Sequence, residues 1–250
     1  MEVNLEGAPI YFEIPILGGI PITSTLVITW AIMLILTGLS IWLTHGLKVS
    51  NVTKRQAVAE YLVTTADNFV NTNMGPTFGR YVPFIAALFT LSIFSSLSSL
   101  IGLFPPTADL STELGWALLV FILITATKIK TNGPGGYLTG FTKPIAVLTP
   151  FNIISELATP ISMAFRHFGN IISGTVITTL LYAALAAANH ALFGLLPGLV
   201  GDILGKIPFL SVGIPAILGV YFDWFSSFMQ AFIFCMLTAM YISSAAEVDE

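Results

Sequence analysis

Uncharged apolar runs of helix length are the feature that most constrains what this chain can fold into. They alternate with shorter polar or Gly/Pro-rich segments, and their length is typical of membrane helices rather than of the roughly ten-residue strands of a membrane β-barrel. Of the 250 residues only 9% are charged and mean hydropathy is +0.89, whereas soluble domains carry about 25% charged residues. The sequence therefore predicts an all-α integral membrane protein.

About five membrane helices are expected, one from each apolar run. The runs are Ser24–Leu43, Tyr81–Phe104, Leu114–Thr127, Thr149–Asn189 and Ile214–Ser244. The more polar segment Asn51–Asn73 predicts an additional, interfacial helix. Two segments predict irregular connections, the Gly/Pro-rich TNGPGGYLTGFTKP after Lys130 and the apolar HALFGLLPGLVGDILGKIPFLSVG after Asn189.

The run Thr149–Asn189 is too long for one upright helix. As a straight helix it would span about 60 Å, twice the roughly 30 Å core of a bilayer. It must tilt strongly, kink near Pro160 or fold as a hairpin. We expect one membrane domain in two parts: residues 1–148 hold the first spans and the cytoplasmic loops, and residues 149–250 form a long, strongly tilted helical hairpin.

Charged residues predict how the chain crosses the membrane. The basic residues in the connections assigned to one side are Lys48, Lys54, Arg55, Arg80, Lys128, Lys130 and Lys143. The other side has Lys206 and the acidic residues Glu2, Glu6, Glu13, Asp109, Glu113 and Asp202. The positive-inside rule then places the N-terminus outside and the C-terminus in the cytoplasm. The acidic N-terminus has no basic n-region, so we expect no cleaved signal peptide.

Arg166 lies in the middle of a long apolar run. A central arginine costs about 2.5 to 3.5 kcal/mol on insertion scales, and a guanidinium cannot escape this cost by losing its proton. Helical spacing puts small polar residues on its face; they are Thr159, Ser162, Asn170 and Ser173, with Glu156 nearby. The last run carries a similar stripe of Asp223, Ser226, Ser227, Gln230, Thr238 and Tyr241. Two polar stripes within apolar helices indicate a hydrated path or a protein-facing groove.

The partner of Arg166 has two candidate locations. Asp223 of the same chain could pair with it as a structural contact between helices. Alternatively, the partner is a carboxylate on another subunit that meets the arginine only transiently.

Three sequence blocks resemble one protein family. PISMAFRHFGNIISG, around Arg166, resembles the arginine motif of subunit a of the F-type ATP synthase. MQAFIFCMLTAMYIS, from Met229 to Ser243, resembles that family's last helix, and PPTADLST, from Pro105 to Thr112, resembles its loop between spans two and three. The blocks occur in the family's order, and the resemblance covers the chain from about Tyr81 to the C-terminus.

The resemblance implies a bacterial stator subunit in the cell's inner (plasma) membrane. In that family, subunit a lies against a rotating ring of small hairpin subunits, the c-ring, and two aqueous half-channels pass protons or sodium ions to and from the ring carboxylates. The family arginine corresponds to Arg166, the asparagine to Asn170 and the last-helix glutamine to Gln230. Expected partners are the c-ring, the peripheral-stalk subunit b, other ATP synthase subunits and the lipid bilayer. No cofactor, metal, nucleotide or nucleic acid is expected to bind, because ATP chemistry belongs to other subunits.

The sequence departs from the family pattern in three places. Thr175 stands where many members have Glu, Asp223 where many have His or Glu, and His167 where Leu is common. Asp223 is either the titratable group of one half-channel or a static polar contact. His167 is either a packed neutral histidine or a proton relay.

Five polar residues complete the predicted ion pathway. Ser162, Ser173 and Tyr241 lie on the two polar stripes. Glu156 is either a water-exposed residue near the helix start or a channel group. Asp109 is expected at the outer surface, where it could line the outer entry.

Two rival functions are also compatible with an intramembrane arginine. A secondary transporter could use Arg166 to bind an anionic substrate, but such proteins carry internal repeats, which this sequence does not show. A membrane scaffold without transport would not need the polar stripes.

Overall fold

Five long apolar helices make up most of the structure, a computed structural model that describes residues 8–15, 19–50, 52–193, 218 and 220–247. Within these residues the segments long and apolar enough to cross a membrane are Ser24–Thr44, Pro76–Ile101, Leu110–Gly140, Ala146–Leu192 and Val220–Ser244. The predicted all-α, multi-pass membrane architecture is therefore confirmed.

One small element departs from the all-helical prediction. Strands β1 (Ile10–Ile14) and β2 (Ile20–Thr23) pair antiparallel, with Glu13 opposite Pro21. The hairpin leads directly into the first helix, whose Ser24 N–H donates to the Pro9 carbonyl. Sequence hydropathy gave no sign of it because two short apolar strands look like the edge of a longer apolar run.

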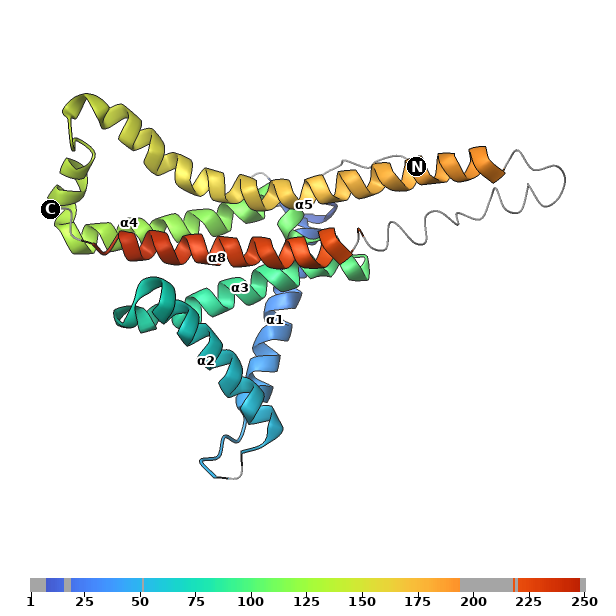
Figure 1. The fold of residues 1–250 in the computed structure, drawn as a ribbon, viewed down its shortest axis with the longest axis horizontal. Coiled ribbons are helices and arrows are strands. Elements are labelled where there is room, and N and C mark those ends of the chain that lie inside the picture. The colour runs from blue at the N-terminus through green and yellow to red at the C-terminus, as the bar shows by residue number, and fades with distance from the viewer. Residues whose placement is uncertain (1–7, 16–18, 51, 194–217, 219, 248–250) are drawn as a thin grey trace.

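Helices α1 (Ser24–Thr44) and α2 (Lys54–Met74) form an arm that points away from the other helices (Figure 1). Thr53 caps α2, because its side chain accepts a hydrogen bond from the backbone N–H of Gln56. The Arg55 guanidinium lies 5.5 Å from the ring centroid of Trp42, which links the two helices. The predicted additional helix is confirmed, while its position at the membrane interface stays a prediction.

The core forms where α3 (Val82–Leu97), α4 (Leu110–Gly140) and α8 (Ser227–Ser244) pack together. Short 3₁₀ turns flank α3 at Pro76–Tyr81, Ser98–Ile101 and Pro106–Ala108. The buried apolar side chains are Ile85, Leu88, Ala117, Val120, Ile124, Phe234, Cys235, Ala239 and Ile242. Several of them are small, which lets membrane helices approach closely.

Helix α4 continues well beyond the predicted end of the third span. It bends at Gly133, whose φ of +73° lies in the left-handed region, and resumes with Pro134 as far as Gly140. Glycine tolerates this φ and proline favours the first turn of a helix. The prediction of an irregular connection from residue 131 to 144 is therefore wrong for most of that segment.

Helix α5 (Thr149–Phe193) is one continuous helix that passes through Pro160. Figure 1 shows that it changes direction along its length and then runs beside α8. Proline in a helix interior removes a hydrogen bond and bends the helix. Of the predicted alternatives, strong tilt, a kink near Pro160 or a hairpin, the run Thr149–Asn189 therefore forms a bent helix and does not fold back on itself. It pairs instead with the last run, as predicted, and its tilt relative to a bilayer stays a prediction.

The last run begins with a π-helix, η5 (Val220–Ser226), which continues into α8. The predicted connection after Asn189 is helical as far as Phe193, and residues 194–217 lie outside the described part. Glu2, Glu6, Asp202 and Lys206, which entered the orientation argument, also lie outside it.

Candidate functional site

Helix α5 has an inner and an outer face. Met163, Ala164 and His167 are buried against the other helices. Ser162, Arg166 and Ser173 are exposed, and we call these three residues the outward stripe. The predicted polar face is therefore divided, because the outward stripe points away from the chain's own helices whereas Asn170 and Thr159 lie toward them.

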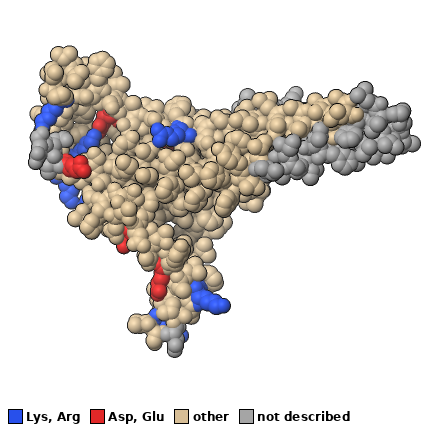
Figure 2. Space-filling model, viewed as in Figure 1, with Lys and Arg blue, Asp and Glu red and all other residues tan. Residues whose placement is uncertain are grey.

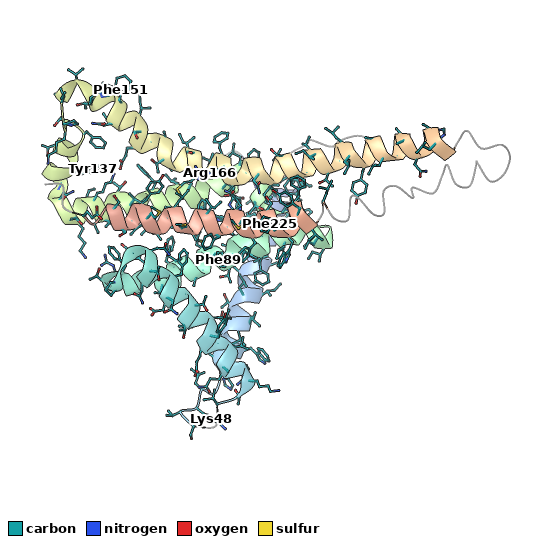
Figure 3. All side chains as sticks on the ribbon, viewed as in Figure 1. Lys48, Phe89, Tyr137, Phe151, Arg166 and Phe225 are labelled. Carbon is teal, nitrogen blue, oxygen red and sulfur yellow. The ribbon has the colours of Figure 1, made fainter. Side chains whose placement is uncertain are left out.

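Arg166 lies where α5 changes direction (Figure 3). In Figure 2, seen from the same side, one isolated patch of positive charge lies in the middle of the molecule, and the other charged side chains gather at the left end and on the lower arm. Among the side chains that the structure describes, Arg166 takes part in no ion pair within 4.0 Å. The backbone of Asp223 lies in η5, but its side chain is not among those described.

Asn170 joins α5 to the start of the last helix. The Ser226 hydroxyl donates to Asn170 Oδ1 across 2.9 Å. Nearby, an added Cβ at Gly174 would lie 3.4 Å from Phe222 Cδ1, so the missing side chain allows the two segments to pack closely. Thr175 is exposed, and its hydroxyl donates to the Ile171 carbonyl of its own helix at 3.0 Å.

The predicted stripe of the last helix splits between two faces. Gln230 and Thr238 are buried, and the Thr238 hydroxyl donates to the Phe234 carbonyl at 2.8 Å. Tyr241, in contrast, is exposed near the end of α8. The second polar stripe is therefore only partly available to a partner on the surface.

His167 and Glu113 form a buried pair that the sequence did not predict. His167 Nδ1 lies 3.1 Å from Glu113 Oε2, and both side chains are 0% exposed. The contact is close but not aligned as a hydrogen bond. His167 Nε2 also lies 3.5 Å from the Ser92 hydroxyl.

Glu113 was predicted in a connection, but it lies in the first turn of α4 and its side chain is buried in the helix bundle. The side of the membrane to which this end of α4 belongs stays a prediction. His167 is packed as expected, but its partner is a carboxylate.

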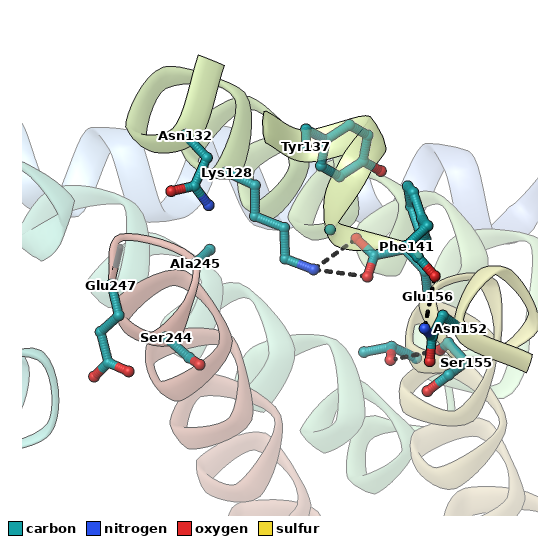
Figure 4. A pocket seen from close by; sticks show the side chains of 12 residues that line it. Lys128, Asn132, Tyr137, Phe141, Asn152, Ser155, Glu156, Ser244, Ala245 and Glu247 are labelled. Carbon is teal, nitrogen blue, oxygen red and sulfur yellow. Dashed lines mark hydrogen bonds and ion pairs between the residues drawn. The ribbon is translucent and has the colours of Figure 1, made fainter. Parts of the chain in front are cut away.

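A polar cavity of about 350 Å³ opens between α4, the start of α5 and the end of α8 (Figure 4). Inside it, Lys128 Nζ lies 2.8 Å and 2.6 Å from the two carboxylate oxygens of Glu156. Glu156 and Tyr241 also line a smaller space of about 100 Å³ beside it. Glu156 is thus paired within the chain, and it borders a polar opening.

Asp109 links two helices. Its Oδ1 accepts a hydrogen bond from the Ser111 N–H at 2.9 Å and so caps α4, and its Oδ2 accepts one from the Thr25 hydroxyl of α1 at 2.8 Å. Both contacts stabilise the fold, so any role in an outer entry would be additional. The described residues contain no group of three or more His, Cys, Asp or Glu side chains that could hold a metal ion.

Comparison with known proteins decides the family. Residues 26–243 match the family model described as ATP synthase A chain. The chain belongs to the ATP synthase subunit a family. It is therefore an ion-translocating stator subunit of the membrane Fo sector, and the resemblance carried by the three sequence blocks is confirmed.

Individual subunit a relatives match over nearly the whole chain. ATP synthase subunit a 1 of Chlorobium luteolum is 33% identical over 232 residues, covering 91% of this chain and 92% of the relative. ATP synthase subunit a of Desulforamulus reducens is 31% identical over 252 residues, covering 98% and 89%. The sodium-ion-specific ATP synthase subunit a of Propionigenium modestum is 31% identical over 246 residues, covering 91% and 75%.

Proposed function

We propose that this subunit a is the stator against which a ring of carboxylate-bearing subunits turns, with Arg166 separating two aqueous half-channels that carry protons or sodium ions. The observation that carries the proposal is the outward position of Arg166 on α5, without an ion-pair partner among the described side chains. A charged side chain within the bilayer is costly. A partner on another subunit offsets that cost.

The permanent charge of Arg166 explains why ions would not leak. A cation beside a ring carboxylate favours the ionised form of that carboxylate, so a loaded ring site is unfavourable directly opposite Arg166. A ring site must instead load from one half-channel, turn through the lipid while neutral and unload into the other. The membrane potential supplies about 2.3 kcal/mol per charge per 100 mV to drive this movement.

The polar cavity beside Lys128 and Glu156 is our candidate for the inner opening. Its lining comes from three helix ends and includes the side chains of Asn152 and Ser155. Figure 2 shows basic side chains near the ends of the helices, and the positive-inside rule assigns such ends to the cytoplasm. We accordingly assign the C-terminus to the cytoplasm and the N-terminus to the outside.

The remaining predicted residues receive roles relative to the c-ring. Ser162 and Ser173 face the ring on the outward stripe, and Asn170 holds the last helix next to it. Asp223, Gln230 and Thr175 belong to the outer path, with Asp109 near its entry. Tyr241 belongs to the inner path, and Glu156, paired with Lys128, lines its opening. Subunit b and the other ATP synthase subunits are the further partners, in the bacterial inner (plasma) membrane.

The test is Arg166→Lys, measured as ion-driven ATP synthesis in vesicles that carry the assembled complex. Lysine keeps the charge but loses the planar fork of five donors, so we expect synthesis to be abolished while the complex still assembles. Arg80→Lys is the matched control, because Arg80 lies 5.0 Å from the Tyr81 ring centroid, a contact that lysine can also make. Near-normal synthesis with Arg166→Lys would defeat the proposal.

A further inference from the structure

Much of the apolar surface of α5 is not covered by the chain's other helices. Only 6% of the residues in its most apolar 18-residue window are buried. Its outer face also carries large apolar side chains, such as Ile161 and Phe165. In a membrane, lipid is as apolar as the protein core, so an apolar pattern by itself does not determine which face turns inward.

Met163, Ala164 and His167 are the buried residues beside Arg166, and His167 is the polar one among them, held by three other helices. Ser92 of α3 and Glu113 of α4 contact its two ring nitrogens. The ring centroids of Trp116 on α4 and Phe234 on α8 lie 6.5 Å and 5.9 Å from the imidazole centroid. The side chain is therefore held both by polar contacts and by rings on two sides.

Fixing His167 inward also fixes Arg166 outward. Consecutive residues of a helix point about 100° apart, and Arg166 directly precedes His167. If α5 turned by one residue, the guanidinium would face Glu113, and this buried carboxylate would trap it. A buried polar pair is a poor source of stability, and its best-attested use is to select one register.

We infer that Glu113 and His167 are positioning residues that set the rotation of α5 and keep Arg166 on the outward stripe. The consequence for ion transport rests on the proposed function of Arg166. The placement itself does not, and the two can be tested separately.

The first experiment measures placement with no reference to transport. Cysteines replace Asn170 and Ser226, whose side chains are in contact, and a short thiol cross-linker is applied to membranes holding the complete complex. Cys235, the chain's only cysteine, is replaced by alanine throughout. We expect His167→Ala to lower the cross-linking yield at least about fivefold, since a rotated helix separates the two thiols. Val120→Ala, an equally buried site on α4, controls for lost packing and should leave the yield unchanged.

The second experiment measures ion-driven ATP synthesis with variants that keep or remove the contact. His167→Ala should lower the rate at least about tenfold, because small displacements of a functional group are costly. His167→Gln and Glu113→Gln keep polar atoms in contact without a titrating group, so both should stay within about threefold of the unmodified rate with an unchanged pH profile.

The outcomes separate the competing explanations. Full synthesis and an unchanged cross-linking yield with His167→Ala would overturn the inference. Gln variants as inactive as His167→Ala would also overturn it, because the pair would then act by exchanging a proton. If Arg166→Lys supports synthesis while His167→Ala still lowers the yield, the proposed function fails and the positioning role stands.

Discussion

Ser226 and Asn170 are joined by a hydrogen bond of 2.9 Å that ties the π-helix η5 to α5 one turn after Arg166. π-helical turns are uncommon and occur frequently at functional sites. Gly174 lies one turn further along α5 and makes room for Phe222 of the same π-helix. The two long helices are therefore attached to each other close to the arginine, and the attachment can be tested.

Ser226→Ala removes the donor to Asn170 and should weaken this attachment by about 1 kcal/mol. We expect the complex to assemble and ATP synthesis to fall by about two- to fivefold, corresponding to less than about 1 kcal/mol of barrier. Thr179→Ala is the control, because that hydroxyl donates only to the Thr175 carbonyl within α5. Equal rates for both variants would show that the contact between the helices has no influence on transport.

Cross-linking tests which face of α5 meets the c-ring. Single cysteines at Ser162 or Ser173, both exposed, should form cross-links with cysteines in the ring helices. Cysteines at Met163 or Ala164 should not, because both side chains are buried. If mass spectrometry detected cross-links only from Met163 or Ala164, the proposed position of the ring against the outward stripe would be contradicted.

Asp223 is the residue at which this chain leaves the commoner family pattern. Asn has nearly the same shape as Asp but cannot titrate, so Asp223→Asn should lower ion-driven synthesis at least about tenfold, a barrier change of about 1.4 kcal/mol. Asp223→Glu should retain part of the rate. The assay should be run with and without sodium, since a sodium-coupled enzyme would use this carboxylate to attract ions. Two near-normal variants would assign Asp223 a purely structural role.

For the Lys128–Glu156 pair we expect a loss of stability, with little change in ATP synthesis. The side chains are 32% and 17% exposed and separated by 2.6 Å, so this ion pair is only partly screened by water. Glu156→Gln should lower the thermal stability of the complex, by an amount on the order of 1 kcal/mol, while changing synthesis by less than about twofold. The charge-swapped double variant Lys128→Glu with Glu156→Lys should recover the stability. A large loss of synthesis at unchanged stability would instead make Glu156 an essential channel group.

Much of the fold was predictable because lipid imposes a simple rule. A backbone inside a bilayer must satisfy its own hydrogen bonds, so each apolar run of sufficient length is a helix. The helical spacing of small polar residues around Arg166 likewise predicted a polar face on this helix, and Ser162, Arg166 and Ser173 are exposed together in the structure. These features depend on neighbours along the chain.

The features that could not be predicted depend on residues that meet only in the folded protein. Glu113 and His167 are on different helices, as are Lys128 and Glu156, and hydropathy contains no information about such pairs. The bend at Gly133 shows another limit. Gly/Pro-rich sequence marks a change of direction, but it does not reveal that the chain re-enters a helix immediately afterwards.

The shallow burial of α5 has a consequence for the biogenesis of this subunit. A newly inserted copy without its partners exposes Arg166 and its neighbouring hydroxyl groups directly to lipid. An arginine side chain that faces lipid is costly, so the isolated subunit carries a free-energy penalty that a partner covering this face would remove. We therefore expect the subunit to be more stable in membranes that contain its partner subunits than in membranes where it is produced alone.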